Sequence, residues 1–157
     1  MKRTATAKVM LIAAGQLVLV GVAVAPQLSA RTSGDTYLVR VAPLDPIDPF
    51  RGAYVTLDYP DLRHDDSRAS LERGDVYVTL VEEDGVWVGD AWSRERPDDG
   101  PYLACDDRSW QVRCGIESFF LPQDEAREAE QLLRDGAVAE ITVDSRGNAA
   151  VVGVRAR

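Results

Sequence analysis

The chain begins with one long apolar stretch and then changes to short alternating segments. Residues 9–25 are apolar apart from Gln16 and small residues. As a helix they span about 26 Å, close to the hydrocarbon thickness of a bilayer. With the flanking residues to Ala30 included, we predict a transmembrane helix over residues 9–30. It follows a basic tail at residues 1–8 and precedes an outer domain at residues 31–157.

Beyond a predicted polar linker at residues 31–35, apolar and polar positions alternate with a period of two, which is typical of strands with one buried face. We predict strands at residues 36–42, 53–59, 75–81, 86–92, 118–121, 138–143 and 149–154, and a further hairpin around the two cysteines. One soluble helix is predicted at residues 124–136, with an Asp cap and a closing glycine. The pattern predicts a mainly β domain, an antiparallel sandwich or barrel-like fold with one α-helix in its C-terminal half.

An N-terminal apolar run has an alternative interpretation as a cleaved signal peptide. The small-x-small site that ends at Ala25 is followed by Pro26, which obstructs a peptidase. The site that ends at Ala30 has Leu28 where a small residue is required. The sequence therefore favours an uncleaved anchor over a signal peptide.

Basic residues predict the orientation of that anchor. Lys2, Arg3 and Lys8 precede the apolar run, whereas Arg31 is the single nearby cation after it. Positive charge is retained on the cytoplasmic side, so the N-terminus is predicted to be cytoplasmic and the C-terminal domain extracytoplasmic in a single-pass cell-membrane protein.

Charge also limits the partners. After the first eight residues, 15 cations face 26 acids, an excess of 11 negative charges. Affinity for nucleic acid depends on cations that neutralise phosphates, so a nucleic-acid partner is not expected. The predicted partners are the lipid bilayer and another membrane or envelope protein.

The two cysteines agree with an exported domain. Cys105 and Cys114 lie in two β-like runs on either side of a polar turn. If these runs form a hairpin, the cysteines lie directly opposite each other, which predicts a cross-strand disulfide in an oxidising compartment. The alternative is a pair of unrelated buried thiols. Two cysteines with no second ligand pair predict no metal site, and the sequence indicates no cofactor.

A stiff segment precedes the second predicted strand. Each proline in its two Asp-Pro pairs restricts the residue before it to extended geometry, and a glycine then permits an abrupt turn into the strand. Two interpretations remain open, a rigid corner that sets strand register and a contact for a ligand or partner. The candidate residues are Asp45, Asp48, Arg51, Gly52, Tyr54, Leu57 and Tyr59.

These residues resemble a family of uncharacterised bacterial proteins described by the motif Gly-Asp-Tyr-x-x-Leu-x-Tyr. The similarity rests on the stretch GAYVTLDY at residues 52–59, which follows the paired Asp-Pro segment, and on the block GIESFFLP at residues 115–122. Ala53 stands where the motif has aspartate, which puts any role of that carboxylate in doubt. The resemblance implies a membrane-associated protein of unknown function and supplies no catalytic residue.

Candidate chemistry is sparse. Neither lysine lies in the outer domain, and His64, the single histidine, lies in an acidic loop without a nucleophile motif. Trp92, Tyr102 and Trp110 would suit a carbohydrate or peptide ligand if they border one groove. We therefore predict a non-catalytic, membrane-anchored binding or assembly module of unknown ligand. The alternative is an envelope hydrolase that acts through carboxylates.

Overall fold

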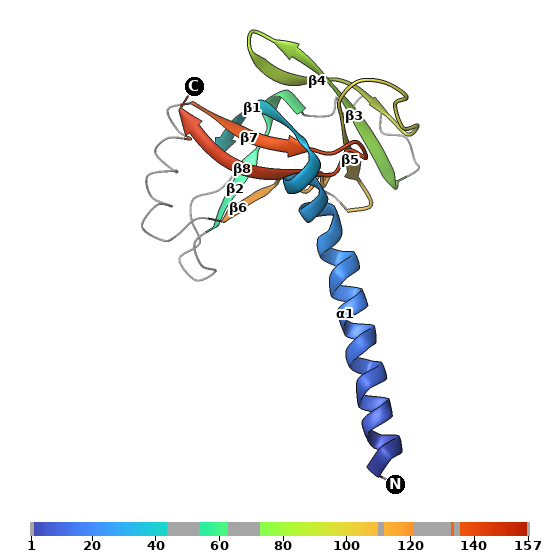
Figure 1. Cartoon of the computed structure of the whole chain (residues 1–157). Helices are drawn as coiled ribbons and strands as arrows, with labels where there is room; N and C mark the ends of the chain where they lie inside the picture. The colour runs from blue at the N-terminus through green and yellow to red at the C-terminus, as the bar shows by residue number, and fades with distance from the viewer. Residues whose placement is uncertain are drawn as a thin grey trace.

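The computed structural model describes residues 2–43, 54–62, 73–109, 112–120, 133 and 136–156. Its longest element is α1 (Lys2–Ser33), which runs away from the β domain and carries the N-terminus at its far end (Figure 1). The helix is long and apolar enough to be a membrane span or a signal sequence, and none of its most apolar window is buried against the described domain. Its exposed Leu, Val and Ile side chains give it the composition of a helix that can cross a bilayer.

The rest of the described chain is mainly β. Its elements are β1 (Asp35–Pro43), β2 (Tyr54–Asp58), the short 3₁₀ helix η1 (Pro60–Leu62), β3 (Asp75–Glu83), β4 (Val86–Ser93), β5 (Tyr102–Asp106), β6 (Ser118–Phe120), β7 (Ala137–Val143) and β8 (Ala149–Ala156). They form a five-stranded sheet in the order β6-β2-β1-β7-β8 and a three-stranded sheet in the order β4-β3-β5. All paired neighbours are antiparallel.

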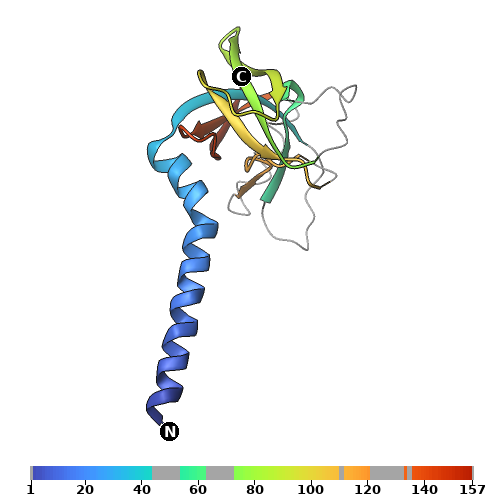
Figure 2. The same cartoon turned by 90° about the vertical axis from the view of Figure 1, so that its right-hand side faces the viewer.

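Both sheets contribute to a single hydrophobic core. Val39 and Ile141 come from the five-stranded sheet, Val78 and Leu103 come from the three-stranded sheet, and all four have no exposed surface. Figure 2 shows the three-stranded sheet from the side on which it covers the larger one. The period of two in the sequence thus produces the buried faces, because successive side chains of a strand point to opposite sides.

The β3–β4 hairpin turns at Asp84 and Gly85, between the predicted strands at residues 75–81 and 86–92. Both residues have positive φ, 51° and 78°. Two-residue turns of this kind match the right-handed twist of the flanking strands, which is why Asp-Gly and Asn-Gly are favoured there.

The cysteine hairpin forms with the predicted register but with only one strand. Asp106 and Arg113 exchange two backbone hydrogen bonds of 2.8 Å. The next residues outward, Cys105 and Cys114, are therefore opposite each other and form a disulfide with a Cα–Cα distance of 4.1 Å. The predicted disulfide is confirmed. Of the two predicted β runs, β5 is a strand, and Arg113 on the other side makes an isolated bridge.

Two further predictions have different outcomes. The polar linker at residues 31–35 is wrong, because α1 continues to Ser33 and β1 begins at Asp35. The C-terminal-half helix at residues 124–136 falls almost wholly outside the described residues. Of that segment, the structure describes Leu133, which is buried in the core, and Gly136. No helix in the C-terminal half is among the described elements.

Candidate functional site

The end of α1 lies against the free edge of β8. The Gln27 side-chain amide donates to the carbonyl oxygens of Gly115 and Ala149, at 3.0 and 3.2 Å. The Arg31 guanidinium donates to the carbonyl of Val151 at 3.2 Å. Side chains four apart on a helix are about 6 Å apart along its axis, close to the roughly 7 Å between alternate residues of a strand. One helix face thus satisfies the outward carbonyls of an edge strand, which would otherwise be open to pairing.

Asp144 provides the second contact with α1. It is 6% exposed and begins the turn between β7 and β8. One carboxylate oxygen accepts from the Ser29 hydroxyl at 2.5 Å and from the Asn148 side chain at 2.8 Å. The other accepts from the backbone N–H groups of Arg146 and Asn148 at 2.8 and 3.0 Å. The carboxylate therefore holds both its own turn and the helix.

The electrostatics of Asp144 follow from these bonds. Burial by itself raises the pKa of the carboxyl, but the hydrogen bonds from Asn148, Ser29 and the turn backbone stabilise the charged form more strongly. The net effect is a pKa below the usual range for aspartate. Asp144 therefore stays ionised at neutral pH.

Gly34 connects α1 to β1 at a point where the backbones of the helix and the sheet are in close contact. Its N–H donates to the Ala30 carbonyl at 3.1 Å, and Ala30 itself has no exposed surface. A Cβ at position 34 would lie 2.4 Å from the Ala30 carbonyl oxygen and 2.9 Å from the backbone of Val143. Glycine is therefore required where helix and sheet approach most closely. We call this region the joint: Gln27, Ser29, Ala30, Arg31 and Gly34 with residues 144–151.

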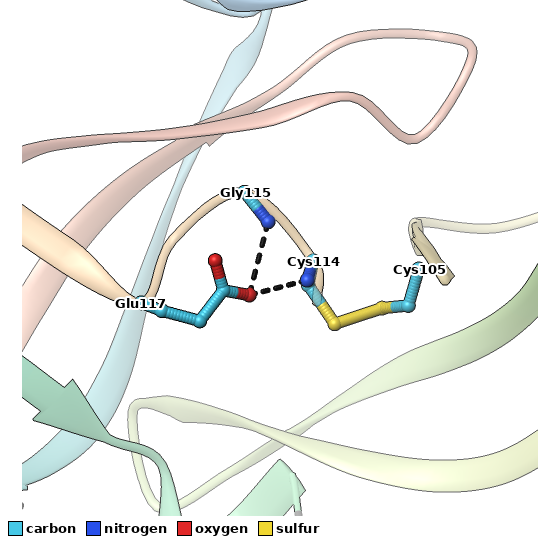
Figure 3. Close-up of a disulfide and its surroundings, with 4 residues drawn as sticks. All are labelled: Cys105, Cys114, Gly115 and Glu117. Atoms are coloured by element: carbon cyan, nitrogen blue, oxygen red, sulfur yellow. Dashed lines mark hydrogen bonds between the residues drawn. A yellow bond between two sulfur atoms is a disulfide. The ribbon is translucent and has the colours of Figure 1, made fainter. Parts of the chain in front are cut away.

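The loop at residues 114–117 receives Gln27 and is held from two sides. The Glu117 carboxylate accepts from the backbone N–H groups of Cys114 and Gly115, while the disulfide ties Cys114 to Cys105 of β5 (Figure 3). Gly115 has a φ of 85°, and a Cβ there would lie 3.1 Å from the Gln27 amide nitrogen. We refer to residues 114–117 as the receiving loop.

The motif segment, which is β2 together with the following Tyr59, also contacts the receiving loop. We call this segment the motif strand. The Tyr59 hydroxyl donates to the Ile116 carbonyl at 2.8 Å, and the Leu57 N–H donates to the Glu117 carbonyl at 2.9 Å. Both side chains are buried, with exposures of 8% for Tyr59 and 3% for Leu57. Burial, followed by the nearby Glu117 carboxylate, raises the pKa of Tyr59 well above its ordinary value. The motif strand thus reaches α1 through two successive contacts, first with the receiving loop and then with Gln27.

Of the other predicted motif residues, the structure describes Tyr54. Tyr54 lies on β2 opposite Phe120, in the register that also pairs Thr56 with Ser118. Asp45, Asp48, Arg51 and Gly52 lie outside the described residues, as does Ala53. Their role at a corner or a contact stays a prediction. Because Leu57 and Tyr59 are buried, neither side chain offers surface to a partner.

Of the three residues of the predicted aromatic groove, the two that the structure describes, Trp92 and Tyr102, lie on opposite faces of the three-stranded sheet. Trp92 and Leu103 are both paired with Val78, so they share the core face. Tyr102 is paired with Thr79, one position further along, and therefore lies on the opposite face. Its hydroxyl donates to the Ser145 carbonyl at 3.0 Å. Trp110 lies outside the described residues.

A hollow of about 580 Å³ lies on one side of the joint and gathers carboxylates. Its lining includes Asp35, Asp98 and Asp144, together with Arg96 and Ser33. Within the described part of the chain, no group of three or more His, Cys, Asp or Glu side chains is arranged to hold a metal ion. His64 lies outside that part.

A second hollow, also of about 580 Å³, lies on the other side of the joint. It separates the Pro26–Gln27 part of α1 from the outer face of β3 and β5, and its lining includes Tyr77 and Arg113. Both hollows are open, and each has α1 as one wall.

Sequence reasoning missed Gln27, Ser29 and Asp144 of the joint and Glu117 of the receiving loop. A signal was present for two of them, because Gln27 and Ser29 are polar positions between the apolar run and a segment interpreted as a linker. Asp144 lies between two predicted strands, where an aspartate is typical of a turn. Its contact with Ser29, 115 positions away, leaves no local trace in the sequence.

Fold and site together define a β-rich domain with a long apolar N-terminal helix built into one edge. A family model described as GDYXXLXY protein matches residues 16–154, nearly the whole chain. The chain therefore belongs to the GDYXXLXY protein family, as the resemblance of its motif implied. No curated protein and no solved structure matched the chain.

Proposed function

We propose that this protein is a single-pass, membrane-anchored binding or assembly module without catalytic activity. Its domain lies outside the cytoplasm, and its partner is another membrane or envelope protein. The observation that carries the proposal is the joint. The apolar part of α1 is exposed, and the C-terminal end of the same helix forms hydrogen bonds with the β domain and packs against it without a linker between them.

The joint supports an uncleaved anchor over a signal peptide. Gln27, Ser29 and Ala30 are built into the domain, and the candidate cleavage positions after Ala25 and Ala30 both lie inside α1. Cleavage after Ala30 would remove the three residues and expose the carboxylate of Asp144. The Cys105–Cys114 disulfide supports an oxidising compartment for the domain.

Assembly is supported by the absence of a flexible tether between span and domain. A binding event at the domain moves α1 as one body with it, because Gln27 and Arg31 contact the same strand edge. A module of this kind suits a protein that positions a partner at a fixed height above the bilayer. The Asp-Pro segment with Arg51 remains our predicted contact for that partner.

The hydrolase alternative finds its best support in the hollow that contains Asp35, Asp98 and Asp144. A carboxyl pair needs one member whose pKa is raised so that it can donate a proton. The pKa of Asp144 is shifted in the opposite direction, and its oxygens already accept four hydrogen bonds. We therefore assign Asp144 to the joint and not to catalysis.

Two measurements test the proposal. Carbonate extraction and protease shaving of intact cells should leave the chain in the membrane fraction and remove its C-terminal portion. Release of the chain into the soluble fraction, or full protection of the domain, would contradict the anchor and its orientation.

The second measurement concerns the partner. A photoreactive residue introduced at Arg51 should give one discrete protein adduct in native membranes. The same residue at Arg155, an exposed position near the end of β8, should not. Arg51→Ala should lose the copurifying partner while its tryptophan fluorescence matches that of the parent. Identical adducts from both positions, or none from either, would overturn the assignment of the contact.

A further inference from the structure

The joint determines the depth of the domain relative to the bilayer, and this inference rests on the proposed anchor. A hydrocarbon layer of about 30 Å takes about 20 helical residues. Counted from Val9, these end near Leu28. Gln27, Ser29 and Arg31, which contact the domain directly, then lie at the level of the lipid headgroups. The domain surface around the joint therefore faces the phosphate layer.

Arginines gather at that surface although the outer chain is acidic. Arg31 lies on α1, and the Arg146 guanidinium is 3.5 Å from the Ser29 hydroxyl. Arg113 lines the hollow whose other wall is Pro26 and Gln27. All three are exposed. Among the described residues, none of them forms a salt bridge with a carboxylate.

Carboxylates are also present in this hollow, and two of them share one arginine. Asp75 and Asp106 both pair with Arg108, at 2.9 and 2.5 Å. Asp75, Asp106, Arg108 and Arg113 together carry no net charge, and among the described lining residues Arg113 is the charged side chain without a salt bridge. Guanidinium groups bind phosphate through parallel N–H bonds, and they do so more strongly where water is partly excluded.

We infer that the hollow between α1 and the β3–β5 face, with Arg113 in its lining, binds the phosphate group of a bilayer phospholipid, and that Arg146, which contacts Ser29 of α1, adds a second cation at the same level. The volume of about 580 Å³ is sufficient for a headgroup, and α1 delivers the hollow to the depth where headgroups lie. The domain would then rest on the lipid surface as well as on its helix. Because the outer chain is acidic, its attraction to anionic lipids would depend on Arg31, Arg113 and Arg146, which form no salt bridge among the described residues.

The test uses the full chain in phosphate-free maltoside micelles. Phosphatidylglycerol is added, and the bound lipid is measured by native mass spectrometry. Each of Arg113→Gln and Arg146→Gln should weaken binding about fivefold, and the double variant about 25-fold, as expected for removal of one and two surface cations. Arg155→Gln is the matched control and should bind as the parent does. Tryptophan fluorescence verifies that each variant is folded.

Three outcomes would overturn the inference. They are unchanged binding by the double variant, equal binding of a phosphate-free diacylglycerol with the same chains, and displacement of the lipid by millimolar inorganic phosphate. The first two remove the phosphate contact, and the third indicates a site for free phosphate. Because the micelle assay needs no protein partner and no native membrane, its failure is distinct from a failure of the anchor in carbonate extraction.

Discussion

The two parts of α1 share one helix but differ in their surroundings. From Val9 to Val24 its large apolar side chains are exposed, from Val24 at 50% to Leu11 at 75%, with nothing from the described domain against them. From Gln27 onward, the polar side chains of Gln27, Ser29 and Arg31 bond to the β domain, and Ala30 is fully buried. An apolar surrounding can pack against any apolar side chain. The β domain, in contrast, contacts α1 through hydrogen-bond donors that must lie opposite particular acceptors. The first part therefore tolerates substitution, and the second does not.

Glycine substitutions should give the largest difference in domain stability between the two parts of the chain. Gly34→Ala places a Cβ against the backbone of Ala30 and Val143, neither of which is the end of a flexible side chain. We expect it to lower the free energy of unfolding of the domain by about 2–4 kcal/mol. Gly21→Ala, with nothing within 4 Å of the added Cβ, is the matched control and should leave that energy unchanged. Urea unfolding in micelles, followed by tryptophan fluorescence, measures both. Equal stability of the two variants would show that the joint is not tightly packed.

Removal of the Asp144 carboxylate should have the next largest effect. Asp144→Ala leaves Ser29, Asn148 and two turn N–H groups without their acceptor, at a cost of about 2–3 kcal/mol. Because its folded-state pKa lies below the unfolded value, the stabilisation is present above about pH 4 and is lost as the pH falls. The parent should therefore lose stability on acidification more steeply than Asp144→Ala. Asp98→Ala, which changes an exposed acid, is the control. Parallel acid profiles for parent and Asp144→Ala would contradict this role.

Tyr59→Phe tests how much the hydrogen bond from Tyr59 stabilises the receiving loop. The variant loses the hydroxyl bond to the Ile116 carbonyl, and we expect a destabilisation of about 1–2 kcal/mol. Because the pKa of Tyr59 is raised in the fold, the stability of the domain should also depend on pH in the alkaline range. The neutral phenol is favoured in the fold, so stability is complete below about pH 10 and declines as the unfolded chain ionises above it. The phenylalanine variant should decline less steeply over that range in alkaline urea titrations. An unchanged slope would place the ionisation elsewhere.

A glutamine pair gives the smallest and most direct comparison. Gln27→Leu removes two hydrogen bonds to the receiving loop and β8, for an expected loss of about 1 kcal/mol. Gln16→Leu makes the same change 11 positions earlier, in the exposed apolar part, and should not alter unfolding of the domain. Hydrogen exchange of the Ala149–Ala156 strand should speed up in the first variant only. Faster exchange in both would indicate that the two parts of the helix are coupled.

Local signals account for the predictions that succeeded. The apolar run, the alternating strand segments and the cysteine pair each depend on residues close together in the chain. The linker prediction failed because a polar segment next to an apolar run looks solvated. In fact Arg31 bonds to a carbonyl 120 positions away. The separation of Trp92 from Tyr102 likewise depends on strand register, which composition does not encode.

The sequence by itself determined that this protein has a helix long and apolar enough for a membrane, a β-rich domain and a disulfide between Cys105 and Cys114, because hydrophobic period and residue spacing act locally. Only the tertiary structure decided that helix and domain are joined without a tether. Helical and strand spacing happen to agree between Gln27–Arg31 and Ala149–Val151, and Gly34 lets the backbones meet. Such an agreement exists only once distant segments have been brought side by side.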